Sequence, residues 1–115
     1  MSSFLFVLAG EVSDSRGDTE IVETEKTGVE GVEQILRDRL AAKESVAGYD
    51  LPDPVNDVAE EIKNLGLEAH PSYFYTLSLF MAEREHTSLE VFEAVDGKIV
   101  PVMPHDHGRP GYPFE

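Results

Sequence analysis

The stretch of residues 72–103 decides the fold that we predict from this sequence. It begins Ser72-Tyr-Phe-Tyr-Thr-Leu-Ser-Leu-Phe-Met-Ala82, the longest charge-free apolar run in the chain. A polar turn at 83–88 follows, and then two shorter apolar segments at 89–95 and 98–103. Runs of aromatic and β-branched residues bounded by turn residues are typical of strands. The stretch therefore predicts three consecutive antiparallel strands that need a helical layer to cover them.

The first of these predicted strands, residues 73–81, is mostly apolar on both sets of alternating positions. A strand with one buried face and one solvated face alternates more cleanly between apolar and polar residues. We therefore predict a central strand, and expect its second face to meet a partner or a second copy of the chain.

The other two predicted strands are joined by Asp96-Gly97. This dipeptide favours a two-residue type I′ hairpin, because both positions need a positive φ. The turn places Val95 opposite Lys98 and Phe92 opposite Pro101. Because Pro101 has no amide to donate, the last strand is predicted at a sheet edge or at a bulge.

The N-terminal half predicts two strands followed by a helix. Residues 4–9 and 19–24 are strand-like, and apolar residues recur at helical spacing over residues 28–46. Thr27 and Glu30 have the spacing of a capping box at the start of this helix. Gly48 is predicted to end it in a left-handed conformation.

A second helix is predicted from Asp53-Pro54 to about Gly66, because an Asp followed by Pro is a helix start signal. The fold class that results is α+β. An antiparallel sheet of about five strands, in the order β-β-α-α-β-β-β, carries both helices on one face. Residues 1–103 are predicted as a single domain, and residues 104–115 as an extended Pro/Gly-rich C-terminal tail.

Acidic residues dominate the composition: 23 Asp and Glu stand against 9 Lys and Arg, so the formal net charge is −14. This charge repels phosphate backbones and anionic membranes, which argues against direct contact with nucleic acid or with a membrane. It attracts basic surfaces, so a basic protein partner is expected. The alternative is that the carboxylates only keep the chain in solution, as in salt-adapted cytoplasms.

The 115 residues contain no cysteine, which excludes disulfides, thiolate catalysis and cysteine-ligated zinc. The apolar N-terminal run is not preceded by positive charges, and it is too short to cross a bilayer. We therefore expect a cytoplasmic protein.

Histidines near the C-terminus form the most specific local pattern. In an extended segment His105 and His107 project to the same side, as a two-imidazole site for a divalent metal would require. His86, or alternatively His70, is the candidate third ligand. The alternative is a polar surface tail. No phosphate-binding glycine loop, dinucleotide fingerprint or nucleophile elbow occurs in the sequence, so no other cofactor is expected.

Carboxylates on the second helix, in the turn at 83–88 and on the strand after it are predicted to form a broad negative surface that binds a partner. These are Glu60, Glu61, Glu83, Glu85, Glu90 and Glu93. In the tail, Arg109 and Tyr112 are residue types that anchor interfaces. The alternative is that the tail aromatics cover the sheet of their own domain.

These observations favour a small acidic non-enzymatic protein that engages a basic site on a partner, as an immunity protein, a nuclease inhibitor or a nucleic-acid mimic does. One alternative is a small metal- or ligand-binding enzyme that uses His105 and His107. Another is a dimeric structural or oligomerisation module that associates through its sheet.

Overall fold

The computed structural model describes residues 1–10, 18–67 and 72–104 of the chain. Within these ranges it has an α+β fold with one antiparallel sheet of four strands in the order β2-β1-β3-β4. The described elements, in chain order, are β1 (Ser2–Gly10), β2 (Asp18–Thr24), α1 (Gly28–Ala42), η1 (Pro54–Val58), α2 (Ala59–Asn64), α3 (Tyr73–Phe80), η2 (Met81–Glu85), β3 (Thr87–Val95) and β4 (Lys98–Val102). The segments η1 and η2 are single π-helical turns.

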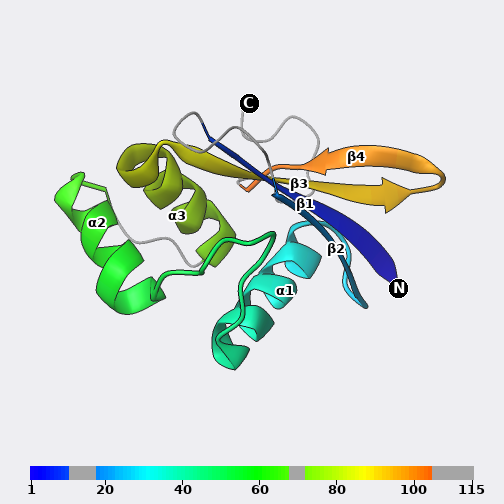
Figure 1. Ribbon diagram of the computed structural model, residues 1–115, viewed down its shortest axis with the longest axis horizontal. Coiled ribbons are helices and arrows are strands. Elements are labelled where there is room, and N and C mark those ends of the chain that lie inside the picture. Colours follow the sequence, from blue (N-terminus) through cyan, green and yellow to red (C-terminus); the bar gives the residue numbers. More distant parts are fainter. Residues whose placement is uncertain (11–17, 68–71, 105–115) are drawn as a thin grey trace.

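The helices lie on one face of the sheet, as predicted (Figure 1). Phe4 and Phe6 of β1 are fully buried on this face, together with Val32 and Leu36 of α1 and Leu77 of α3. Burial of apolar side chains from three elements in one cluster is the main stabilisation of such a two-layer domain. The helix α2 packs against α3.

The prediction of a strand at residues 73–81 is wrong: residues Tyr73–Phe80 form helix α3. A short apolar run does not distinguish a buried strand from a buried helix by itself. The buried side chains recur at helical spacing, with Tyr73, Phe74, Leu77 and Met81 facing the core. The central strands are therefore β1 and β3, and the described chain has four strands and three helices where five and two were predicted.

The helix α3 begins at a polar cap that comes partly from a distant element. The side chain of Ser72 accepts a hydrogen bond from the Tyr75 amide at 3.1 Å. The carboxylate of Glu33 on α1 accepts from the amides of Tyr73 and Phe74 at 3.2 and 2.8 Å, and also from the Ser72 hydroxyl. These contacts satisfy amide donors of the first turn that have no partner inside the helix.

The prediction for the hairpin is confirmed. Asp96 and Gly97 both have positive φ, at 51° and 80°. Val95 pairs with Lys98, and β4 lies at the edge of the sheet. The predicted strands at residues 4–9 and 19–24 are also present, as β1 and β2.

The first helix begins at Gly28, as predicted, but its capping bond and its end differ from the prediction. At its start the Thr27 side chain makes no capping bond, and the Gly28 amide instead donates to Glu93 of β3 at 3.1 Å. At its end the chain leaves the helix at Lys43, which takes the left-handed conformation with φ of 59°. Gly48 also has a positive φ, but it lies in the following loop.

The start signal of the second helix is confirmed. The Asp53 side chain accepts from the amides of Val55 and Asn56 at 2.7 and 2.8 Å, and Pro54 follows it. The turn η1 and the helix α2 continue from there, and Gly66 follows with φ of 80°. Of the predicted tail at residues 104–115, residues 105–115 lie outside the described residues.

Candidate functional site: an acidic cleft

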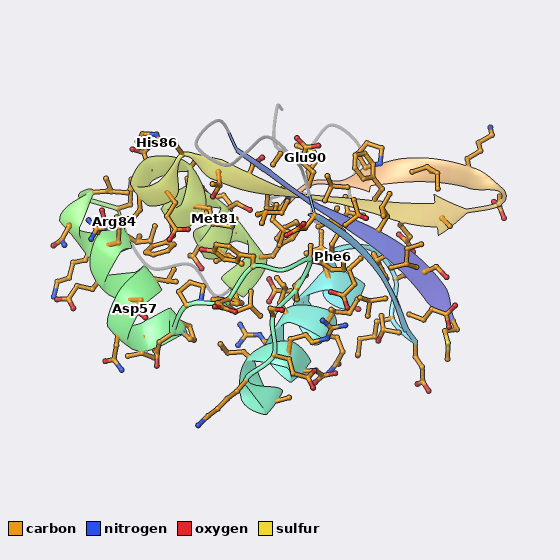
Figure 2. The ribbon with its side chains drawn as sticks, viewed as in Figure 1. Phe6, Asp57, Met81, Arg84, His86 and Glu90 are labelled. Carbon is orange, nitrogen blue, oxygen red and sulfur yellow. The ribbon has the colours of Figure 1, made fainter. Side chains whose placement is uncertain are left out.

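A cleft of about 380 Å³ opens at the end of the molecule that carries α2 and η2. We call it the acidic cleft, because carboxylates dominate its wall and Arg84 is the one lining cation among the described residues. Its lining residues are Tyr49, Asp50, Pro52, Asn56, Asp57, Glu60, Glu61, Phe80, Arg84 and Glu85. Figure 2 shows Asp57 and Arg84 at this end of the molecule, away from Phe6 in the core.

Two short helical elements form facing walls of the acidic cleft. Glu60 and Glu61 lie in the first turn of α2, which continues directly from η1. Arg84 and Glu85 lie in η2, which continues directly from α3. Because α2 packs against α3, the two walls are held at a fixed separation.

Arg84 neutralises little of this charge. Its Nη1 lies 3.9 Å from Glu61 Oε1, at the long limit for an ion pair, and its side chain is 64% exposed. An exposed pair of this geometry contributes about 0–1 kcal/mol, so Arg84 is free to move without a large cost in stability. The wall retains an excess of negative charge that a second cation could share.

The loop after α1 forms a third wall of the acidic cleft, and its residue Tyr49 links this wall to η2. Its hydroxyl donates to Glu85 Oε1 at 2.6 Å. Burial of the ring raises the pKa of Tyr49 far above its ordinary value, and the hydrogen bond to Glu85 raises it further. The phenol therefore stays protonated and acts as a donor that orients the Glu85 carboxylate.

The loop that carries Tyr49 is anchored by residues outside the cleft. Backbone bonds between Val46 and Tyr49, at 2.8 and 3.0 Å, close a tight turn. Glu20 of β2 accepts from the Ala47 amide at 2.9 Å, and Arg39 donates to the carbonyl of Ser45 at 2.6 Å. The cleft wall is thus tied to both the sheet and the end of α1.

A second hollow, of about 400 Å³, adjoins the acidic cleft and shares Asp50 with it. Leu40, Leu51 and Pro54 line it together with charged residues of both signs. This hollow gives a docked partner an apolar surface beside the charged one.

The structure divides the predicted partner-binding carboxylates among three places. Glu60, Glu61 and Glu85 line the acidic cleft, and Glu83 is exposed nearby on η2. Glu90 projects from β3 on the face of the sheet opposite the helices (Figure 2).

The placement of Glu93 differs from the prediction. Glu93 is buried, with 8% of its surface exposed, and accepts a hydrogen bond from the start of α1. Burial prevents its carboxylate from reaching a partner. The predicted docking residues Arg109 and Tyr112 lie outside the described residues.

The predicted metal site is not assembled from the described residues. His86 is exposed and ends η2 in a left-handed conformation, with φ of 56°. His70, His105 and His107 lie outside the described ranges, so their metal site stays a prediction. Among residues 1–10, 18–67 and 72–104, no three His, Asp or Glu side chains converge on a position for a metal ion.

Sequence reasoning missed Tyr49, Asp50 and Asp57 as members of the site. A signal for Asp57 was present: it precedes Glu60 and Glu61 by three and four residues, which puts the three carboxylates on one helical side. No local pattern indicated Tyr49, because its contact with Glu85 joins residues 36 positions apart.

None of the helices in the described part of the chain is long and apolar enough to span a bilayer. Comparison with protein-family models, with curated proteins and with solved structures gives no match to this chain.

Proposed function

We propose that this chain is a small acidic binding protein, without catalytic activity of its own, that engages a basic site on a protein partner through the acidic cleft. The observation that carries the proposal is the cleft wall, where Asp50, Asp57, Glu60, Glu61 and Glu85 face one exposed arginine. Charge complementarity of this kind accelerates encounter and selects basic partners.

The cleft suits an extended cationic surface better than a single ion. Its carboxylates come from the loop after α1, from η1, from α2 and from η2, and they are spread around about 380 Å³. A protruding arginine or lysine of a partner fits this arrangement, because its charged group can share several carboxylates while Arg84 swings aside. The apolar hollow beside it accommodates the side chains around such an anchor.

The test measures binding of an arginine-rich peptide by titration calorimetry, with amide chemical shifts to locate the site. The triple variant Glu60→Gln/Glu61→Gln/Glu85→Gln is expected to bind about tenfold more weakly or worse, at about 0.5–1 kcal/mol per exposed charge pair. Binding by the unchanged protein should weaken as sodium chloride is added, because the interaction is screened.

A matched control removes three carboxylates elsewhere. Glu23, Glu25 and Glu30 lie outside the cleft, and changing all three to Gln alters the net charge by the same amount. This variant should bind almost as well as the unchanged protein. Equal losses in the two triple variants, or binding that ignores salt, would show that the cleft is not the site.

A further inference from the structure

The sheet has a second face that no described helix covers, here called the outer face. Because paired residues in antiparallel strands point to the same side, the register assigns it. Leu5 of β1 pairs with Ile21 of β2 and with Phe92 of β3, and Phe92 pairs with Pro101 of β4. An apolar row therefore crosses all four strands on the side opposite Phe4 and Phe6.

Large apolar side chains are open to solvent on this face. Ile21 is 71% exposed and Ile99 is 61% exposed. Extended apolar patches on a protein surface mark sites of interaction, whereas single exposed residues do not. Leu5, Phe92 and Pro101 connect Ile21 on β2 to β4, the strand that carries Ile99. The two isoleucines therefore belong to one continuous apolar patch.

The hairpin that ends this sheet is exposed on both sides. The pairing of β3 with β1 ends at Glu93, so the tip beyond it is a two-stranded ribbon that projects past the helices (Figure 1). Val95 and Val100, on the helix side of the ribbon, are 39% and 42% exposed. A two-stranded ribbon is marginally stable in water by itself, so this one gains from being covered.

Charge selects the kind of partner that fits the outer face. Among the described strand residues on this face, Glu23 and Glu90 are the charged ones, and both are acidic. The helical side carries the acidic cleft, and the whole chain has a net charge of −14. Electrostatic repulsion between two copies of this acidic chain is weakest at the outer face, whereas the cleft is the surface whose charge is complementary to a basic partner.

The size of the face fits a dimer. With about 4.8 Å between strands and about 3.3 Å per residue, the four strands cover about 500 Å² in projection. Each partner of a standard interface buries about 800 Å², so the sheet alone supplies more than half of that area and the projecting hairpin adds to it.

We propose that two copies of this chain associate through their outer faces. The contact is isologous, with the same patch on both chains, and the two sheets stack about 10 Å apart between outer layers of helices. Leu5 and Phe92, on the two central strands, lie at the centre of the contact, and Ile21 lies beside Leu5 on β2. The acidic cleft of each copy stays open on the far side, so the dimer presents two clefts.

The two surfaces respond to salt in opposite ways. Association of two chains of charge −14 is opposed by repulsion, so sodium chloride strengthens the dimer. Binding of a cation at the cleft weakens in the same series. A failure of one proposal is therefore distinguishable from a failure of the other.

The experiment is sedimentation equilibrium of the full chain over a range of protein and sodium chloride concentrations. A reversible dimer that tightens with salt is expected. Ile21→Lys should weaken it tenfold or more, because both copies carry the change across one interface. Val55→Lys is the matched control: Val55 is 72% exposed on η1, away from the sheet, and its variant should dimerise like the unchanged protein.

Glu90→Gln gives a second, independent readout. It removes a carboxylate from each of the two facing sheets, so it should tighten the dimer severalfold and leave peptide binding at the cleft unchanged. Loss of the dimer in Glu90→Gln, or equal weakening by Ile21→Lys and Val55→Lys, would overturn the proposal. Melting curves check that each variant is folded.

A full chain that stays monomeric at every salt concentration also overturns the proposal. Another occupant then covers the outer face. If the full-length variant Tyr112→Ser/Phe114→Ser becomes dimeric where the unchanged chain is monomeric, that occupant is the chain's own C-terminal segment.

Discussion

Glu20 is one carboxylate that joins three parts of the chain. It accepts from Arg39 Nη1 and Nη2 at 3.1 and 2.6 Å, and from the Ala47 amide at 2.9 Å. Arg39 also holds the carbonyl of Ser45, so the pair links β2, the end of α1 and the loop that leads to Tyr49. Two parallel guanidinium bonds to one carboxylate fix geometry as well as charge.

The pair makes stability depend on pH. The hydrogen bond from Arg39 lowers the pKa of Glu20 below its ordinary value. A carboxylate whose pKa is lower in the folded state stabilises the fold above its unfolded pKa, and this stability is lost as the pH falls through the folded value. Glu20→Gln should therefore cost about 1–2 kcal/mol at pH 7 and much less at pH 3.

Urea unfolding at both pH values measures this difference. Glu25→Gln is the control, because Glu25 is exposed and lies just beyond the end of β2. A cost for Glu20→Gln that is equal at pH 7 and pH 3 would contradict a role for the charged pair.

The helix α3 shows how elements of this fold depend on one another. Its first amides are capped by Glu33, which lies about 40 residues earlier on α1. The hydroxyls of Thr76 and Ser78 bond back to carbonyls of the preceding turn, at 3.1 and 2.9 Å, so their polar groups are satisfied inside a buried helix. Glu33 therefore makes the capping of α3 depend on the packing of α1 against it.

Glu33→Ala should destabilise the protein by about 1–3 kcal/mol, because it leaves buried amide donors of α3 without a partner. Glu30→Ala is the matched control on the same helix: Glu30 is exposed, and its loss should cost less than about 0.5 kcal/mol. Guanidinium unfolding followed by far-ultraviolet circular dichroism measures both. Equal effects of the two substitutions would refute the capping role of Glu33.

This dependence also explains which elements the sequence could predict. The Asp96-Gly97 hairpin and the Asp53-Pro54 helix start rest on residues that are neighbours in the chain, and both are present. The strand predicted at residues 73–81 failed because Tyr, Phe and Thr favour strands, whereas the cap from Glu33 and the contacts with α1 impose a helix.

The candidate site follows the same division. The helical spacing of Glu60 and Glu61 and the polar turn with Glu85 were visible in the sequence. These residues come together in one cleft only because of how the helices are arranged. That arrangement depends on α3, which the sequence analysis predicted as a strand. Burial of Glu93 depends on its register opposite Phe4, which sequence alone did not give.

The whole molecule carries far more negative charge than it neutralises. The described ion pairs involve Arg37, Arg39 and Arg84, against a formal net charge of −14 for the full chain. The excess repels itself in the compact state more than in the unfolded chain, where charges are farther apart. Added salt therefore favours folding.

The melting temperature should rise with sodium chloride, most steeply at low ionic strength, where the screening length changes most. A relief of about 1 kcal/mol corresponds to roughly 4 °C for a domain of this size. Calorimetry of the Ile21→Lys variant at low protein concentration measures the effect apart from any dimerisation. Potassium chloride should act alike, and a melting temperature that falls with either salt would contradict the prediction.

The bond between Gly28 and Glu93 has a consequence for the order in which the chain acquires its structure. This hydrogen bond joins residues 65 positions apart. In addition, β1 lies between β2 and β3 in the sheet, and β3 comes much later in the sequence. During synthesis, a nascent chain that ends before Thr87 holds α1 without its cap and β1 with one open edge. Because these contacts are distant in sequence, the domain is expected to fold more slowly than a helical domain of similar size.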